Sequence, residues 1–182
     1  MNEHAASLRE RQDPLRKRYR DAPDEARITD HAIASSPGAD PFHGSVAAGE
    51  GAPFAFGIHR AVGGDHDLPN PGDLLCAALA ACLDSTLRMI AARMAVNLET
   101  LEVTATAFAD VRGCLMVDPS IPAGFERIEL EVRFGAGTGT DPAQLEALTA
   151  NAERCCVVLQ TLRAGIPITT KFSAPALDAR DG

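Results

Sequence analysis

The sequence has 182 residues, of which 46% are hydrophobic and 23% are charged, a composition that fits a folded domain and argues against extensive disorder. Seventeen basic and twenty-five acidic residues give a net charge of −8, which repels phosphate backbones and anionic membranes, so neither nucleic acid nor a membrane is expected as a partner. Tryptophan is absent and aromatic residues make up 4%, so a core of aliphatic side chains must pack closely, and dimerisation would help to bury it.

The N-terminal segment is polar and lacks the apolar stretch of a secretory signal. No apolar run approaches the roughly 20 residues that are needed to cross a bilayer. We therefore expect a cytoplasmic protein. Its five cysteines are too few and too irregularly spaced for a disulfide framework, and a reducing compartment would keep them as thiols.

Residues 8–20 are rich in arginine and predict a basic helical arm with a thin apolar stripe. Pro14 suits the first turn of a new helix, so two short helices are an alternative. We expect the arm to be solvated or to embrace a dimer partner rather than to bind an anion, because a run of charge is usually a solvated face. The predicted organisation is an arm over residues 1–26, one domain over residues 27–175 and a flexible tail over residues 176–182.

Three short extended segments follow the arm and are separated by turn-forming clusters, which predicts an antiparallel meander. These segments cover residues 27–34, 42–48 and 54–60. A helix is predicted next, with Asn70 as its cap, Pro71 in its first position and Asp73 in its first turn. Residues 74–83 are apolar on every side, so we expect this helix to be buried all round.

Alternation with a period of two predicts a long hairpin whose strands cover residues 101–108 and 125–134. A second helix is predicted from the cap at Asp141 to Gly165. A last strand is predicted over residues 166–172. The order of these elements predicts an α+β fold rather than a doubly wound parallel sheet.

Both predicted helices carry cysteines, with Cys82 in the first and Cys155 and Cys156 in the second. Spacing alone also fits a packing role, because free cysteine often behaves as a small hydrophobe. No C-x-x-C motif pairs with a second one or with H-x-x-x-H, so no structural zinc and no other cofactor is expected. Periodicity places Cys155 nearer the middle of the apolar stripe of its helix and Cys156 toward the edge.

These segments resemble the OsmC/Ohr family, the osmotically inducible and organic hydroperoxide resistance proteins. The family's first helix reads N-P, then L, then A-x-A-A-C-like residues, which here are Asn70, Pro71, Leu74, Ala78, Ala80, Ala81 and Cys82. Its second helix carries A-E-x-x-C-P, which is matched here by Ala152, Glu153, Arg154, Cys155, Cys156 and, in place of the proline, Val157. The resemblance extends over residues 27–172.

The resemblance implies an OsmC-like fold in which antiparallel sheets surround two central cysteine-bearing helices of an intertwined homodimer. It also implies a thiol-dependent peroxidase that acts on organic hydroperoxides. Cys82 would attack the peroxide and become a sulfenic acid, Cys156 would condense with it, with Cys155 as the alternate, and an external dithiol would reset the pair. The Ala- and Leu-rich surround favours substrates with apolar tails.

A buried thiol needs a cation or oriented N–H groups before it ionises. In the family this cation is an arginine from the strands before the first helix, held by a glutamate directly after the N-P. The resemblance assigns the cation to Arg60, or to His59 if the strand aligns without a gap. Gly72 stands at the glutamate position, and Asp73 beside it either reaches the arginine or completes the helix start. This departure leaves a second function open, that of a non-catalytic OsmC-fold binding or redox-sensing protein.

Overall fold

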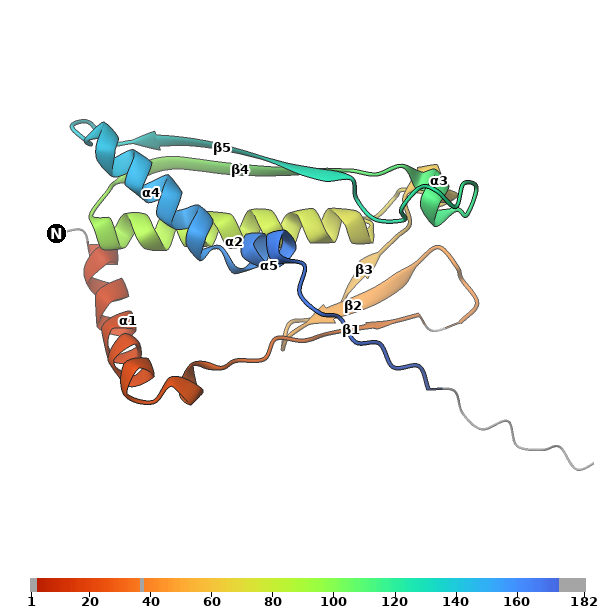
Figure 1. Cartoon of the computed structure of the whole chain (residues 1–182), viewed down its shortest axis with the longest axis horizontal. Helices are drawn as coiled ribbons and strands as arrows, with labels where there is room; N and C mark the ends of the chain where they lie inside the picture. The colour runs from red at the N-terminus through yellow and green to blue at the C-terminus, as the bar shows by residue number, and fades with distance from the viewer. Residues whose placement is uncertain (1–2, 37, 174–182) are drawn as a thin grey trace, which may run out of the picture.

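The computed structural model describes residues 3–36 and 38–173, so the predicted tail at residues 176–182 lies outside the described part (Figure 1). Its elements, in chain order, are α1 (Glu3–Asp21), η1 (Pro23–Ala26), β1 (Ala32–Ser35), β2 (Gly44–Ala48), β3 (Phe54–Phe56), η2 (Arg60–Val62), α2 (Pro71–Met94), β4 (Leu98–Phe108), α3 (Val111–Cys114), β5 (Arg127–Ala136), α4 (Pro142–Cys155) and α5 (Val157–Ala164). This order confirms the predicted α+β class.

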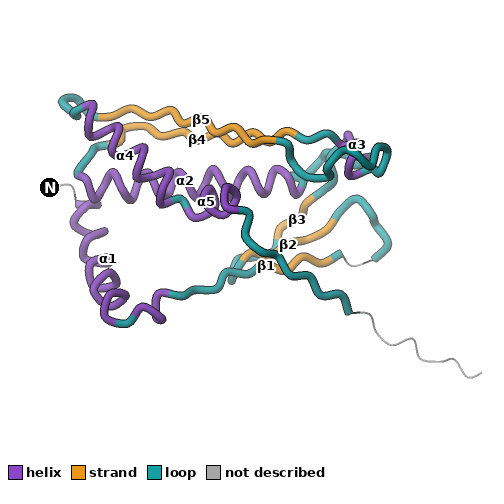
Figure 2. The backbone as a smooth tube through the Cα atoms, viewed as in Figure 1, coloured by secondary structure: helices purple, strands orange, loops and turns teal. Residues whose placement is uncertain are grey.

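Helix α2 is the central element of the molecule. It runs beneath the β4–β5 hairpin and contacts α1, α4 and α5 (Figures 1 and 2). Strands β1, β2 and β3 form a separate antiparallel meander in the predicted order, although β1 and β3 are shorter than expected. This small sheet lies apart from the layer of helices in the views of Figures 1 and 2.

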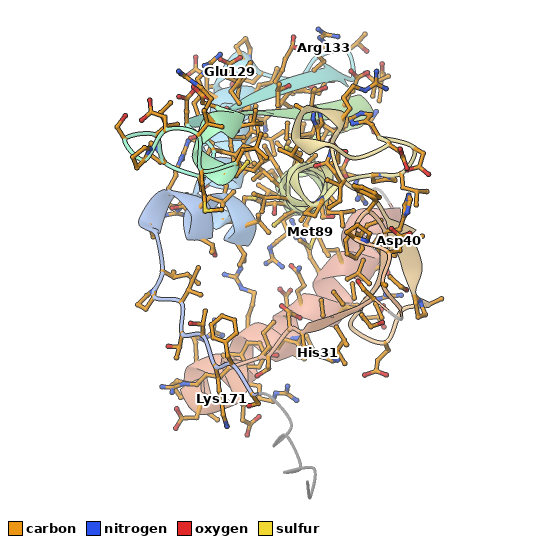
Figure 3. The ribbon with its side chains drawn as sticks, turned by 90° about the vertical axis from the view of Figure 1, so that its right-hand side faces the viewer. His31, Asp40, Met89, Glu129, Arg133 and Lys171 are labelled. Atoms are coloured by element: carbon orange, nitrogen blue, oxygen red, sulfur yellow. The ribbon has the colours of Figure 1, made fainter. Side chains whose placement is uncertain are left out.

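The hairpin register shows why β4 and β5 cover α2. Apolar residues are paired across the two strands, as in Leu101 with Phe134, Val103 with Val132 and Ala105 with Leu130. Because side chains alternate between the two faces of a strand, these pairs share one face, which packs on the core. Glu129 and Arg133 lie on the exposed outer face of the hairpin (Figure 3).

The core forms where α2, α4, α5 and the hairpin meet. Leu79, Leu83 and Leu87 recur four residues apart on α2 and make one buried stripe. Leu148 of α4 and Cys156 pack against this stripe with no exposed surface. The two cysteine-bearing segments are therefore joined through the same core.

The prediction that residues 74–83 are buried all round is wrong for the single chain. Ala77, Ala78 and Ala81 are exposed, because the hairpin, α4 and α5 cover only part of the surface of α2.

Helix α2 is also long and apolar enough, by length and composition alone, to cross a bilayer. This corrects the expectation that no segment of the chain is long enough. Of its most apolar 18-residue stretch, 28% is buried. Core helices of water-soluble proteins meet the same criterion, so this finding by itself places nothing in a membrane.

Two predictions for the C-terminal third are also wrong. The second predicted helix is broken at Cys156, whose φ of −70° and ψ of 107° end α4 and precede α5. Residues 166–172 form no strand, because no described strand of this chain lies alongside to pair with them. Ile168 and Phe172 in this segment are almost fully exposed.

Helix α1 is one continuous helix with Pro14 inside it rather than two short ones. It is attached to the C-terminal end of α2 by polar contacts. The Arg93 guanidinium lies 3.1 Å from the Asp13 carboxylate, and the Arg9 side chain donates a hydrogen bond of 2.9 Å to the Arg93 carbonyl. The basic arm is therefore docked on α2 at this end.

We expect the substitution Leu148→Ala to lower the free energy of unfolding by about 2–5 kcal/mol, because it would leave a cavity in the packed core. Val117→Ala is the matched control, because Val117 is 68% exposed and its truncation should change stability by less than about 0.5 kcal/mol. Urea denaturation followed by circular dichroism measures both values. Equal stability losses in the two variants would contradict the core assignment.

Candidate active site

The start of α2 is fixed by reciprocal capping. The side-chain oxygen of Asn70 accepts hydrogen bonds from the backbone N–H groups of Gly72 at 2.8 Å and Asp73 at 3.3 Å. The Asp73 carboxylate in turn accepts a hydrogen bond of 2.9 Å from the backbone N–H of Asn70. Asp73 therefore completes the helix start, which is one of the two roles that the sequence left open.

Position 72 is shaped by an aromatic ring. A Cβ atom added to Gly72 would lie 3.0 Å from Cζ of Phe125 and 3.0 Å from the side-chain oxygen of Asn70. These distances are tighter than ordinary contacts, so a larger residue here would require Phe125 to shift. The ring therefore takes the space beside the position where the resembling family has its glutamate.

Cys82 and Cys156 meet in the interior, although they come from distant parts of the chain. Cys82 lies in the middle of α2 and is partly buried, whereas Cys156 has 0% of its surface exposed. Cys155, at the end of α4, is exposed. This is the reverse of the expectation from helical periodicity, because the buried stripe of α4 passes through Leu148, Ala152 and Cys156, which recur four residues apart and leave Cys155 beside the stripe.

Several groups act on the pKa of the Cys156 thiol. Burial is the largest effect and raises the pKa, and the neighbouring Cys82 thiol raises it further. The backbone N–H groups of Leu159 and Val158, in the first turn of α5, act in the opposite direction. The net effect is a raised pKa, so Cys156 is protonated at neutral pH.

The two candidate cations lie in or next to η2. His59 caps this short helix, and its Nδ1 accepts a hydrogen bond of 3.0 Å from the backbone N–H of Ala61. Arg60 is exposed. Among the described residues, no hydrogen bond or ion pair links Arg60, His59 or Asp73 to Cys82 or Cys156. The structure thus brings the two cysteines together but leaves the predicted cation and carboxylate outside their immediate surroundings.

A cleft of about 400 Å³ opens between α2, β5 and the two C-terminal helices, and neither cysteine is among its lining residues. Leu79, one turn before Cys82, and Leu159, one turn after Cys156, line it, together with other apolar side chains from β5 and α5. An ion pair between Arg163 and Glu153, 3.2 Å apart, also lines the cleft.

Sequence reasoning missed the Arg163–Glu153 ion pair and the first turn of α5, because both depend on the break after Cys156. The proline that follows the cysteine in the resembling family was a usable signal, since the residue before a proline disfavours helix.

His43 bridges the loop before β2 and the loop before α2. Its Nδ1 lies 2.8 Å from the Asp40 carboxylate, and its Nε2 lies 3.2 Å from that of Asp67. The hydrogen bonds to Asp40 and Asp67 raise the pKa of His43. Neither this cluster nor any other group of three His, Cys, Asp or Glu side chains in the described part of the chain has an arrangement that could hold a metal ion.

Residues 64–171 match a protein family described as OsmC-like protein. Similar solved structures include an OsmC-like protein of unknown function from Vibrio cholerae, with 15% identity and a TM-score of 0.62, covering 74% of this chain and 94% of that one. The OsmC-like protein of Mycoplasma pneumoniae has 12% identity and a TM-score of 0.61, with 75% and 88% covered. An organic hydroperoxide resistance protein, OsmC, from Legionella pneumophila has 26% identity and a TM-score of 0.51, with 76% and 91% covered. A search of curated proteins found no match.

Brief treatment of the reduced, folded protein with N-ethylmaleimide should modify Cys155 and Cys114 first, because both are exposed. Cys156 should react only after unfolding, because it is buried and its pKa is raised. Mass spectrometry of tryptic peptides measures the extent at each site. Labelling of Cys156 as fast as that of Cys114 would show that the burial is wrong.

The bridge at His43 should make thermal stability depend on pH. Because the folded pKa is raised, the stabilisation is complete below the unfolded value of about 6.5 and is lost as pH rises through the folded value. Melting temperatures of the native protein and of His43→Gln, measured from pH 5.5 to 8.5, should therefore converge toward the alkaline end. A difference that is independent of pH would exclude a charged His43.

Proposed function

This chain belongs to the OsmC-like protein family, and on that premise we propose that it is a thiol-dependent peroxidase that reduces organic hydroperoxides. The observation that carries the proposal is the interior meeting of the Cys82 and Cys156 thiols. The Legionella protein described above, named an organic hydroperoxide resistance protein and a predicted redox protein, supports the same activity.

In the proposed reaction, the Cys82 thiolate attacks a peroxide oxygen, the O–O bond breaks, and the leaving alkoxide takes up the proton that the Cys82 thiol lost to solvent and departs as an alcohol. The sulfenic acid on Cys82 then condenses with Cys156, which forms the disulfide and releases water. A protonated Cys156 does not compete for the peroxide. The N–H groups of Val158 and Leu159 would stabilise its anion when it attacks the sulfenic acid. An external dithiol would close the cycle.

The cleft between α2, β5 and the two C-terminal helices favours substrates with apolar tails. Five of its lining side chains are leucine or isoleucine, which would bury a hydrocarbon chain, and the Arg163–Glu153 ion pair in the same wall would face the polar end of the substrate. This supports organic hydroperoxides as the substrate class. A reducing compartment such as the cytoplasm would maintain the thiols between turnovers, and we propose it as the location.

We further propose that the working form is an intertwined homodimer. The exposed alanine face of α2, the unpaired segment at residues 166–172 and the separate β1–β3 sheet all leave apolar surface uncovered in one chain. A second copy would cover it and would bring another set of charged residues, Arg60 among them, toward each pair of cysteines. A monomeric mass in sedimentation velocity would contradict this proposal.

The alternative of a redox-sensing protein rests on one observation. Asp73 is engaged in capping and Gly72 replaces the family glutamate, so an arginine brought to Cys82 would lack the carboxylate that holds it in the resembling family. A sensor would lose thiols to peroxide but would not turn over with a dithiol. The same assay therefore separates the two functions.

One equivalent of cumene hydroperoxide should cost the reduced protein two thiols per subunit, and turnover with dithiothreitol should vanish in Cys82→Ser, because this substitution removes the attacking sulfur. Cys114→Ser is the matched control and should retain full activity, because Cys114 lies on α3, away from the pair. Thiol titration and coupled peroxide consumption measure these outcomes. A thiol count that stays constant under peroxide would discard the proposal.

A further inference from the structure

Three thiols, rather than two, lie close to the proposed reaction, and they differ in their access to solvent. Cys156 has 0% of its surface exposed, Cys82 is partly buried, and Cys155 is exposed although it is the immediate neighbour of Cys156 in the chain. A disulfide between Cys82 and Cys156 would place the Cys156 sulfur beyond the reach of a bulky reductant. Thiol–disulfide exchange depends on which sulfur can be attacked and on access to it.

We propose that Cys155 is a third redox residue, which moves the disulfide from the interior to the surface as a Cys155–Cys156 bond. This relay rests on the proposed peroxidase function and adds a step to it. The Cys155 thiolate attacks the Cys156 sulfur, the Cys82–Cys156 bond breaks, and Cys82 leaves as a thiolate, while the proton of Cys155 goes to solvent. No net oxidation occurs in this step.

A protein dithiol then completes the relay from outside. One of its thiolates attacks the exposed Cys155 sulfur, and its second thiol resolves the mixed disulfide. Cys155 and Cys156 are restored as thiols, and the reductant leaves as a disulfide. Because Cys82 is released before this step, it is ready for another peroxide molecule while the reductant is still bound.

The break between α4 and α5 supports the relay. Within a continuous helix, successive side chains point about 100° apart and the linking peptide is fixed in the helical hydrogen-bond ladder. The peptide between Cys155 and Cys156 is the last one of α4, because the Cys156 N–H still donates to the Ala152 carbonyl at 2.9 Å. The backbone leaves the ladder directly after it, at the Cys156 ψ of 107°, so a movement of this peptide breaks only the last hydrogen bond of α4. The attacking thiol is also tethered to its target, which replaces an encounter in solution by a local rearrangement.

Peptide mapping tests the proposal on the full chain. Trypsin releases residues 155–163 as one peptide with both neighbouring cysteines, whereas Cys82 lies in the peptide of residues 61–88. After one equivalent of cumene hydroperoxide and alkylation with N-ethylmaleimide, we expect a population in which peptide 155–163 has lost two hydrogens and Cys82 is alkylated. A Cys82–Cys155 crosslink, or a Cys82–Cys156 crosslink alone, would overturn the relay.

Peroxide stoichiometry gives an independent readout. Without any dithiol, the native protein should consume two equivalents of cumene hydroperoxide per subunit, because the relay frees Cys82 for a second attack. Cys155→Ser should consume one equivalent at an unchanged initial rate, and its reduction by thioredoxin should be about tenfold slower or more. Cys114→Ser, another exposed cysteine, should behave like the native protein.

Failure of the relay can be told from failure of the peroxidase. If Cys155→Ser matches the native protein in stoichiometry and in reduction rate while Cys82→Ser is inactive, the relay is wrong and the peroxidase stands. If peroxide consumes no thiols in the native protein, both are wrong. Circular dichroism confirms that each serine variant is folded before these comparisons.

Discussion

The burial of Cys156 at the junction of α4 and α5 is the constraint on which the rest of the site depends. Its sulfur lies in the core beside Cys82 because Cys156 continues the buried stripe of Leu148 and Ala152, and the chain leaves the helix directly after it, which starts the first turn of α5 there. Burial raises its pKa and the N–H groups of α5 oppose that rise, so the thiol is held neutral in an environment that can still accept a transient charge. An uninterrupted helix could not provide both conditions at one sulfur.

Helix α2 supplies the other half of this arrangement. Its capped start at Asn70 fixes where the helix begins, and its leucine stripe fixes which side faces the hairpin and α4. Cys82 lies at the edge of the buried stripe, because it directly precedes Leu83 on the helix. The exposed alanines on the other side of α2 have no cover in the single chain, and this is the physical basis for proposing a second copy. The proposed cysteine chemistry and the proposed dimer thus depend on two faces of one helix.

Access is the quantity that distinguishes the thiols in function. In the proposed function, a peroxide with an apolar tail would enter the cleft beside Leu79 and Leu159, and a protein reductant would be too large to follow it. Cys155 lies on the solvent side of the same peptide bond that holds Cys156 in the core. In the proposed relay, the buried sulfur that is oxidised and the exposed sulfur that is reduced therefore belong to adjacent residues. Phe125, packed against Gly72, shows that the region of the missing glutamate is filled rather than open.

The sequence by itself determined the α+β class, the capped start of α2, the long hairpin and the family, because each of these follows from local periodicity, cap residues or short motifs. It did not identify Cys156 as the buried one of the two cysteines, because the apolar pattern centred the stripe on Cys155, whereas packing against α2 buries Leu148, Ala152 and Cys156. It also overstated the burial of α2 and paired residues 166–172 as a strand, because exposure and strand pairing depend on neighbours that are distant in sequence or absent from the chain. The Arg163–Glu153 pair appeared only in the folded structure for the same reason. Tertiary packing decides which side chains share a space, and one sequence read locally does not contain that information.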